Sequence, residues 1–495
     1  MWIIDAIRRV VNKLFPKASI KRSLGADIAV SSKMQDAIEL WGRMYVDDPP
    51  WKNVDGTKTM NLPAAISHEF ARLVTVECKM HVCGSPFADY INAEFQRDLP
   101  RQRLKEIVEK CCAKGGISMK PYVNGNHIEI DFTQADSFYP TEYDSNGRIT
   151  GAVFADMKRI GDYQYTKLEV HEFNPDETIT DENGNQRTTG VHHITNHAFR
   201  SEKIMAYTSN DDTTLYNARD LLHEEVPLNS VPGWEQIEKQ AAVIDVDRPL
   251  FVYVKVPAAN NIDTRSPLGC SVYARAVGAI RDADEQYTET KFEYEALQAA
   301  IDADEDLFKK DRQGNAVLPK GKERIFRSYD VASKNGAPFL KEFAPQFRDT
   351  SLFNGLNHYL RVVEWLCELS YGTLSDPSNV DRTAEEVKMS KQRSYSAVAS
   401  MQSVWEDGLN DLVYIMSVYA QLYNLAGVQT GKYQLDLTWG DGVLEDVDKE
   451  YNRRWQQVLG GKLKPELFMA WYYGCSVDEA QAMMPSAPPA LPEEE

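Results

Sequence analysis

The sequence predicts an α+β fold that is mainly helical, on the basis of three observations. Before about residue 115 and after about residue 270, apolar residues recur at the spacing of amphipathic helices. Between 117 and about 256 the chain is rich in Tyr, Val, Ile, Thr and Phe, and the turn sequences NGN, DSNG, IGD and DENGN interrupt it, which is typical of short strands. The chain has 495 residues, 43% of them apolar, so it can bury a core divided over two to four domains.

Charge and cysteine content exclude several classes of protein. The 55 Lys and Arg face 74 Asp and Glu, a formal charge of −19, which excludes a basic surface that binds nucleic acid by releasing counterions. No stretch approaches the roughly 20 apolar residues of a membrane helix, so no membrane is expected. The seven cysteines form no CxxC pair, which indicates a reducing compartment, and the adjacent Cys111 and Cys112 are expected to be buried.

The first elements are expected to be helices. The opening MWIIDAIRRVVNKLF is no signal peptide, because charges break its apolar run, and it predicts a short amphipathic helix that docks on its own chain or on a partner. Further helices are expected over 33–45 and after Asn61, with Pro63 near the start of the second. LVTVECKMHVCG alternates like a strand, and LPRQRLKEIVEKCCAKGG predicts a helix that Gly115 and Gly116 close.

The strand-rich block contains a long stretch with the alternating pattern of paired β-strands. GRITGAVFADMKRIGDYQYTKLEVHEF predicts a hairpin or meander, and VHHITNHAF continues it after a polar loop.

The C-terminal half returns to helices. Ser266 as N-cap and Pro267 at the first position predict a helix of about 30 residues, roughly 45 Å long. Short strands and turns are expected from 309 to 349, and then a helix that ends near Gly372. After the polar loop TLSDPSNVDR, Thr383 and Glu386 form a capping box for a helix of over 40 residues, in which Gly408 is a candidate kink. The strand KYQLDLTW, a helical region at 445–458 and helices at KPELFMAWYY and SVDEAQAMM follow.

No enzyme motif is complete. HEFAR at 68–72 has Arg72 where a zinc-binding helix needs its second histidine. The HHxxxH run of His192, His193 and His197 lies in an expected strand and is interpreted as surface histidines. P-loop and GxSxG sequences are absent.

The acidic word DADE occurs twice, in RDADEQY at 281–287 and in IDADEDLF at 301–308. In a helix Asp282 and Glu285 are one turn apart, whereas Asp284 points away from Asp282, so one metal ion cannot collect all three. The acidic residues continue along the helix with Glu289, Glu293 and Glu295. A solvated face is the ordinary interpretation, and an acidic wall that repels a polyanion is the sharper one.

Several long stretches of the chain together carry a resemblance, although none of them is a catalytic signature. They are VPAANNIDTRSPLGCSVYARAVGAIRDADEQYTETKFEYE, FRDTSLFNGLNHYLRVVEWLCELSYGTLSDPSNVDRTAEEVKMSKQRSY, ELWGRMY, NLPAAISHEFARLVTVE and QADSFYPTEYDSNGRITGAVF, followed by the C-terminal helices. They resemble the portal protein of tailed bacteriophages that infect Gram-positive hosts, and the resemblance covers most of the chain.

The resemblance implies a ring, usually of twelve subunits, with wing, stem, clip and crown regions. The implied regions are a wing part at 1–266 (helices, then the β-rich block), a first stem helix at 267–299, a clip at 300–349, a second stem helix at 350–371, a tunnel loop at 372–382, a long wing helix and strand at 383–444, C-terminal crown helices at 445–484 and a disordered tail at 485–495.

The implied function is structural rather than enzymatic, with no cofactor and no metal. The ring would sit in the virion at the portal vertex of the capsid, after assembly in the host cytoplasm, and would conduct double-stranded DNA during packaging and ejection. Its implied partners are the terminase that drives packaging, head-completion or adaptor proteins, and scaffolding and major capsid proteins. The alternatives are a metal-dependent phage-head nuclease that uses the DADE carboxylates and a monomeric head–tail adaptor.

The resemblance also places residues. Twelve copies of an acidic stem helix would form a sleeve that repels the phosphates, so that DNA slides and does not adhere. Large aromatic residues of the stem helices pack either between subunits or within one chain. The stem carboxylates are Asp282, Asp284, Glu285, Glu289 and Glu293; the tunnel loop contains Ser375, Asp376, Pro377, Ser378, Asn379, Asp381 and Arg382; the clip carboxylates are Asp302, Asp304, Glu305 and Asp306; and the aromatic residues are Tyr287, Phe292, Tyr294, Trp365 and Tyr371. The basic residues in or after the tunnel loop either contact phosphates or form intrahelical pairs with Glu385 and Glu386; they are Arg382, Lys388, Lys391 and Arg393.

Overall fold

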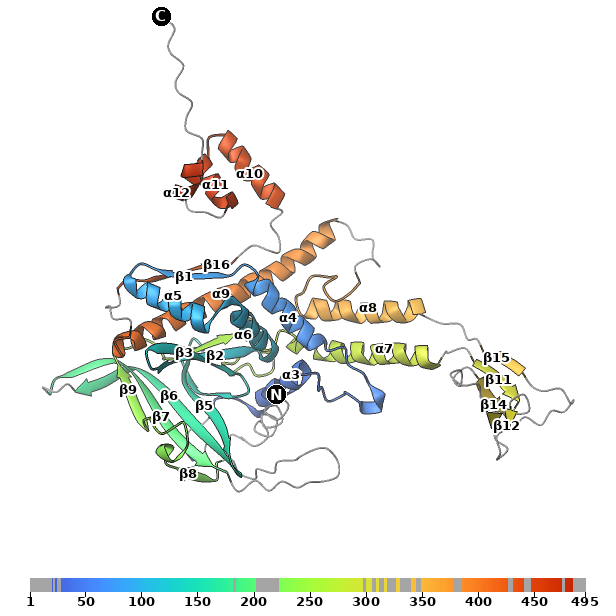
Figure 1. Ribbon diagram of the computed structural model, residues 1–495, viewed down its shortest axis with the longest axis horizontal. Helices are drawn as coiled ribbons and strands as arrows, with labels where there is room; N and C mark the ends of the chain where they lie inside the picture. Colours follow the sequence, from blue (N-terminus) through green and yellow to red (C-terminus); the bar gives the residue numbers. More distant parts are fainter. Residues whose placement is uncertain are drawn as a thin grey trace, which may run out of the picture. The chain divides into compact units, whose positions relative to one another are not determined.

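The computed structural model describes most of the chain as two compact units, Met1–Trp439 and Gly440–Glu495. The elements are mixed helix and strand, which confirms the predicted class (Figure 1). Within the described ranges, no helix is both long enough and apolar enough to cross a membrane. The described residues are 20, 23–24, 28–180, 184–201, 222–296, 300–304, 309–310, 316–317, 326–329, 340–343, 349–376, 384–425, 431–439, 447–473 and 477–483.

Two of the predicted N-terminal helices form as expected. The Ser31 hydroxyl accepts the N–H of Met34 at 3.2 Å and begins α3 (Ser32–Tyr45). Helix α4 (Leu62–Thr75) follows Asn61, which has φ 55°, and carries Pro63 in its first turn. The apolar face of each helix lies in the core.

The strand prediction over LVTVECKMHVCG is wrong in its first half. Val74 continues the buried stripe of Ile66 and Phe70 at four-residue spacing, so α4 runs on to Thr75. Only β1 (Lys79–Cys83) is a strand, and it pairs antiparallel with β16 (Gln434–Thr438).

Helix α5 (Pro86–Asp98) was not predicted. Phe87, Ile91 and Phe95 form its buried stripe, and Ser85 followed by Pro86 is a helix-start signal in the sequence.

Helix α6 (Arg101–Lys114) ends at Gly115, as predicted. Gly115 has φ 85°, and its N–H donates to the Cys111 carbonyl at 2.8 Å. A Cβ on Gly115 would lie 2.4 Å from the Gly269 carbonyl oxygen, so only glycine fits there. Gly116 begins the next strand and takes no part in the cap.

Replacing Gly115 with alanine is expected to destabilise the fold by about 3 kcal/mol or more, because a strained φ and a backbone clash add. Gly125→Ala is the matched control: Gly125 also has positive φ, 62°, but faces open space, so it should cost only about 1 kcal/mol. Urea unfolding of the three proteins measures both losses. Equal losses would contradict the close packing at Gly115.

The block predicted to be β-rich contains two antiparallel sheets. The central sheet has the strand order β10–β2–β3. The larger sheet has the order β4–β5–β6–β7–β8, with β9 also paired to β7. The predicted hairpin is β5–β6, with Ile160 opposite Tyr163. The strands are β2 (Gly116–Asn124), β3 (His127–Gln134), β4 (Phe138–Tyr143), β5 (Ile149–Ile160), β6 (Tyr163–Thr180), β7 (Gln186–Arg200), β8 (Glu224–Val226), β9 (Gln240–Ile244) and β10 (Val252–Lys255).

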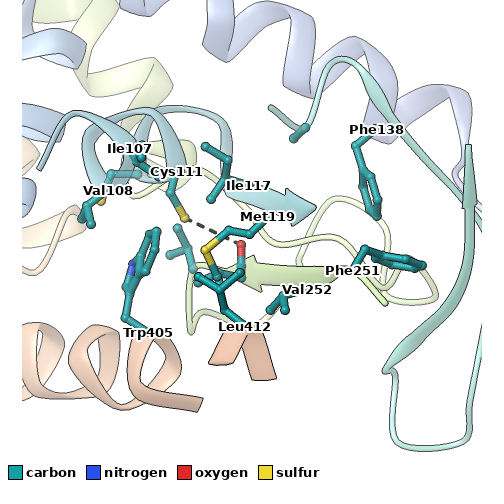
Figure 2. Close-up of a cluster of buried hydrophobic side chains, with 14 of the residues drawn as sticks. Ile107, Val108, Cys111, Ile117, Met119, Phe138, Phe251, Val252, Trp405 and Leu412 are labelled. Atoms are coloured by element: carbon teal, nitrogen blue, oxygen red, sulfur yellow. Dashed lines mark hydrogen bonds between the residues drawn. The ribbon is translucent and has the colours of Figure 1, made fainter. Parts of the chain in front are cut away.

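The core lies where the central sheet meets α6 and the long helix α9 (Ala384–Leu422). Figure 2 shows Cys111 of α6, Met119 of β2 and Trp405 of α9 converging on this point. Cys111 and Cys112 are fully buried, as predicted. Gly408, the candidate kink, lets α9 approach β10, because a Cβ there would lie 2.6 Å from Val254 Cγ2.

The helix predicted to begin at Ser266 and Pro267 begins later. The Ser266 hydroxyl accepts the N–H of Leu268 within a turn, and the chain forms only a 3₁₀ turn, Ala274–Ala276, before α7 (Val277–Ala296). Tertiary hydrogen bonds hold the intervening residues against the end of α6: the Val272 N–H and the Ser271 hydroxyl both donate to the Cys112 carbonyl. These contacts override the local capping signal.

Between α7 and α8 (Asp349–Leu366) the chain forms short strands, as predicted. Strand β11 (Ala300–Asp304) lies between β14 (Phe326–Tyr329), to which it is parallel, and β15 (Leu340–Phe343), to which it is antiparallel. Strands β12 (Lys309–Lys310) and β13 (Ala316–Val317) form a separate antiparallel pair.

Helix α8 ends earlier than the predicted boundary near Gly372. Glu368 has φ 61°, and the N–H groups of Glu368 and Leu369 donate to the carbonyls of Trp365 and Glu364. This is a Schellman motif, which stops the helix with backbone hydrogen bonds alone. Thr383, the predicted cap of the next helix, lies outside the described residues.

The second unit contains the three predicted C-terminal helices, α10 (Val447–Leu459), α11 (Pro465–Tyr473) and α12 (Val477–Met483). Phe468 of α11 is buried, and its ring lies 5.3 Å from that of Tyr451 of α10. The predicted tail at 485–495 lies outside the described residues.

Candidate functional site

Helices α7 and α8 form an antiparallel pair (Figure 1). Tyr294, near the end of α7, has its ring 6.3 Å from that of Phe353, near the start of α8. At the opposite ends, Arg275 lies 3.9 Å from Glu368. At 1.5 Å per residue, α7 and α8 are about 30 and 27 Å long. The two paired helices are therefore connected along the chain by the segment that contains the inserted strands β11–β15.

Four of the five predicted stem carboxylates share one side of α7. Asp282, Glu285, Glu289 and Glu293 are separated by three, four and four residues, which places them within an arc of about 80° at 100° per residue. Asp282 and Glu289 are exposed, and Glu285 and Glu293 are half-buried. These four residues are called the acidic face. Within this face, Glu285 Oε1 lies 2.8 Å from Nε of Arg281, one turn earlier on the same helix.

Asp284 does not belong to the acidic face, which corrects its grouping with the other four. It is 2% exposed and accepts hydrogen bonds from the indole N–H of Trp51 and the N–H of Met60, both at 2.9 Å. Burial raises its carboxyl pKa above the usual value. Asp284 therefore fixes the 51–60 segment to α7, and it points away from Asp282, so the two carboxylates cannot ligate the same metal ion.

The second DADE word falls in the inserted strands. Asp302 and Asp304 are in β11, the middle strand of its sheet. Their side chains, and all of Glu305 and Asp306, lie outside the described part, so their role stays a prediction.

Only the first part of the predicted tunnel loop is described. Ser375 is buried and Asp376 is exposed. Arg393, a candidate phosphate contact, has its guanidinium 6.0 Å from the centre of the Tyr371 ring. Pro377, Ser378, Asn379, Asp381 and Arg382 lie outside the described residues, as do the side chains of Lys388 and Lys391.

Glu364 of α8 contacts this loop, and sequence reasoning did not identify it. The side chain is 0% exposed. Its Oε1 accepts the N–H groups of Gly372, Leu374 and Ser375 at 3.0, 2.6 and 2.9 Å, and its Oε2 accepts the Ser375 hydroxyl at 2.8 Å. The sequence signal was weak: an acidic residue among apolar ones in VVEWLC.

Three of the five predicted stem aromatic residues are largely exposed within the described part of the chain. Phe292 is 66% exposed, Trp365 54% and Tyr294 48%. The choice between packing within one chain and packing between subunits stays a prediction.

The rejected histidine motifs have structural roles. His68 of HEFAR bonds to Glu109, and Arg72 pairs with Glu69. The interpretation of His192 as a surface residue is wrong, because its side chain is 0% exposed. His193 and His197 do retain exposure. Among the residues that the structure describes, no three His, Cys, Asp or Glu side chains are grouped to hold a metal ion.

His192 belongs to a buried chain of hydrogen bonds. His171 Nε2 lies 2.8 Å from Glu169 Oε1, and His171 Nδ1 lies 2.8 Å from His192 Nε2. If His171 donates to the carboxylate, its Nδ1 accepts from His192, and both imidazoles are neutral. Burial lowers the pKa of His171 and takes that of His192 to about 2.

Two lysines balance the charge of Glu169. Lys120 Nζ lies 2.9 Å and Lys167 Nζ 3.1 Å from its carboxylate. Lys120 is in β2 and Glu169 is in β6, so the cluster joins the central sheet to the larger one. Sequence reasoning missed the cluster, although Lys167, Glu169 and His171 occupy every second position of a strand and therefore share one face.

No family model matches the chain, and no curated protein matches it. Several solved chains resemble it in structure, among them the following two. One is described as "Neck of native GTA particle computed with C12 symmetry", with 10% identity, a TM-score of 0.40 and coverage of 93% of this chain and 99% of that one. The other is described as "Neck of empty GTA particle computed with C6 symmetry", with 10% identity, a TM-score of 0.38 and coverage of 86% and 92%. At these TM-scores neither likeness carries an argument about function.

Proposed function

We propose that the chain is a subunit of a ring-shaped portal at one vertex of a phage capsid, where it conducts double-stranded DNA and joins head to tail. Its partners are further copies of the chain, the packaging terminase, head-completion or adaptor proteins, and scaffolding and major capsid proteins. The chain supplies a channel wall and performs no chemical step.

The order of elements carries this proposal. The resemblance implies stem helix, clip, stem helix, loop and long wing helix. The chain has α7, the inserted strands, the antiparallel α8, the loop that begins at Gly372 and the 39-residue α9. An antiparallel pair with an insertion between its two helices is the connection that a stem and clip require.

The acidic face supports the transport of DNA. The acidic face has four carboxylates on each α7, and Arg281 forms an ion pair with one of them, Glu285, so the surface remains negative. Facing a channel, that surface repels phosphates within a Debye length of about 8 to 10 Å. A duplex then meets no position along the wall at which it binds favourably. A lysine-rich wall, in contrast, would bind the duplex by releasing counterions.

The first test is the mass of the full-length chain in solution. Twelve chains of 56.1 kDa give a particle of about 670 kDa, and negative-stain images should show a ring with a central hole. Analytical ultracentrifugation measures the mass. A compact species of one chain mass would contradict the proposal and favour the monomeric adaptor.

The metal-dependent nuclease is the weaker alternative, because Asp282 and Asp284 lie on opposite sides of α7. It requires Asp282→Asn to abolish a nuclease activity that depends on a divalent metal. The portal proposal expects no such activity in the unchanged chain and unchanged assembly in this variant.

A further inference from the structure

The buried carboxylate of Glu364 serves the loop that follows α8. Three backbone N–H groups and one hydroxyl from residues 372–375 surround it. Within the described residues, no Lys, Arg or His side chain forms an ion pair with it. The polar groups of the loop therefore satisfy this carboxylate, as in a backbone nest around an anion.

A second contact of α8 holds the next residue of the loop. Asn357 Oδ1 accepts the N–H of Asp376 at 2.8 Å, and its Nδ2 lies 3.5 Å from the Asp376 carbonyl oxygen. Asn357 precedes Glu364 by seven residues, so both side chains leave the same side of α8. The segment 372–376 is thus attached to the helix at two points about two turns apart.

Glu364 is not needed to end the helix. The Schellman motif at Glu368 and Leu369 already satisfies the last carbonyls of α8 with backbone donors. An apolar side chain at 364 would also suit a buried position at lower desolvation cost. What the carboxylate adds is a set of acceptors for N–H groups of the loop.

We propose that Glu364 and Asn357 are positioning residues, which hold the segment 372–376 in a fixed place against α8. This inference rests on the proposed portal function. The loop transmits or resists the movement of DNA only when its first five residues are rigidly attached to the helix. Loss of the attachment leaves the ring intact and lowers the yield of packaged DNA.

The experiment uses full-length variants in assembled procapsids. Glu364→Ala removes the acceptors, Glu364→Gln keeps a carbonyl oxygen and restores most of them, and Asn357→Ala removes only the contacts with Asp376. Asn354→Ala and Glu368→Gln are matched controls, because both residues are exposed on or just after the same helix. The readouts are ring formation in negative stain, amide hydrogen exchange of 372–376, and DNA packaged per capsid.

In Glu364→Ala and Asn357→Ala we expect intact rings and faster exchange at 372–376. The increase should be on the order of 30-fold for each charge-assisted bond lost in Glu364→Ala, and roughly 5-fold at Asp376 in Asn357→Ala, where the lost bond is between neutral groups. Packaged DNA should fall at least about 10-fold in Glu364→Ala, and Glu364→Gln should recover most of it. Both controls should match the unchanged protein.

Two results would overturn the inference. Unchanged exchange in Glu364→Ala would mean that the carboxylate does not hold the loop. Faster exchange with normal packaging would mean that the attachment plays no part in transport. If Glu364→Ala forms no rings, Asn357→Ala decides by the same criteria. Failure of the unchanged chain to form rings or package DNA would instead remove the proposed function.

Discussion

Replacing Asp282, Glu285, Glu289 and Glu293 together with lysine should leave the ring assembled and lower packaged DNA at least about 10-fold. The four changes shift the charge of each chain by about eight units, and all four residues lie on one side of α7. In a ring, that change turns a repulsive wall into one that binds phosphate. Each DNA step would then require the exchange of counterions.

Packaging assays over a series of salt concentrations measure this effect. The defect should weaken as salt rises, because counterion release drives the adhesion. A neutral variant replaces the same four residues by Asp282→Asn, Glu285→Gln, Glu289→Gln and Glu293→Gln, and it should show a smaller packaging defect. This variant replaces the lysine variant in the assay if the lysine variant assembles poorly.

The matched control puts lysine at four exposed acids outside α7, which are Asp55, Glu77, Glu142 and Glu406. It carries the same change in net charge, so a defect confined to the α7 variant assigns the effect to the acidic face. Normal packaging in the α7 variant at low salt would show that the face does not meet DNA.

Acidification from pH 7.5 to 4.5 should destabilise the first unit, with His192 alone contributing about 3 kcal/mol. Burial lowers its folded pKa to about 2, from 6.5 in the unfolded chain. As pH falls through 6.5, the unfolded state takes up the proton first. Stability is therefore complete above that pH and is lost progressively below it. His171 acts in the same direction.

Glu169 adds a further loss of folding stability in more acidic solution. Lys120, His171 and Lys167 hold its pKa well below the usual value despite its burial. A carboxylate of this kind stabilises the fold above its unfolded pKa of 4.5, and that contribution disappears as pH falls below it. Tyr419 of α9 also faces this cluster, and it stays neutral throughout this range.

His192→Gln tests the assignment, because glutamine can still donate to His171 Nδ1 but does not titrate in this range. Urea unfolding at pH 7.5 and 4.5 should show a smaller acid loss in this variant than in the unchanged chain. His197→Gln is the control on the same strand, because the His197 side chain is partly exposed. Between pH 7.5 and 4.5 this control should lose as much stability as the unchanged chain. Equal losses in all three proteins would contradict the role of His192.

Local signals predicted those elements whose start and end depend on nearby residues. Helix α3 follows its serine cap, α6 stops at a glycine, and the β5–β6 hairpin turns where its sequence indicates. The start of α7 could not be read in this way, because hydrogen bonds from Ser271 and Val272 to Cys112, far away in sequence, hold the preceding residues. Helix α8 ended early for a comparable reason, since Glu368 adopts a left-handed conformation without being glycine.

The candidate site was predictable only in part. Helical periodicity alone separates Asp284 from the other four carboxylates of α7. Its burial was not readable, because Trp51 and Met60 come from a loop over 200 residues earlier. Glu364 gave only the weak signal of an acidic residue among apolar ones, since most of its partners are backbone N–H groups, which every sequence contains. The chain of His171 and His192 required knowing which two strands are neighbours.

The antiparallel course of α7 and α8 has an electrical consequence. Every helix carries a macrodipole, with positive charge at its N-terminus and negative charge at its C-terminus. Side by side and reversed, the two dipoles largely cancel, so the backbone contributes almost no net potential gradient along the pair. The potential that a passing polyanion meets there comes from side chains, and single substitutions can tune it while the helices themselves stay unchanged.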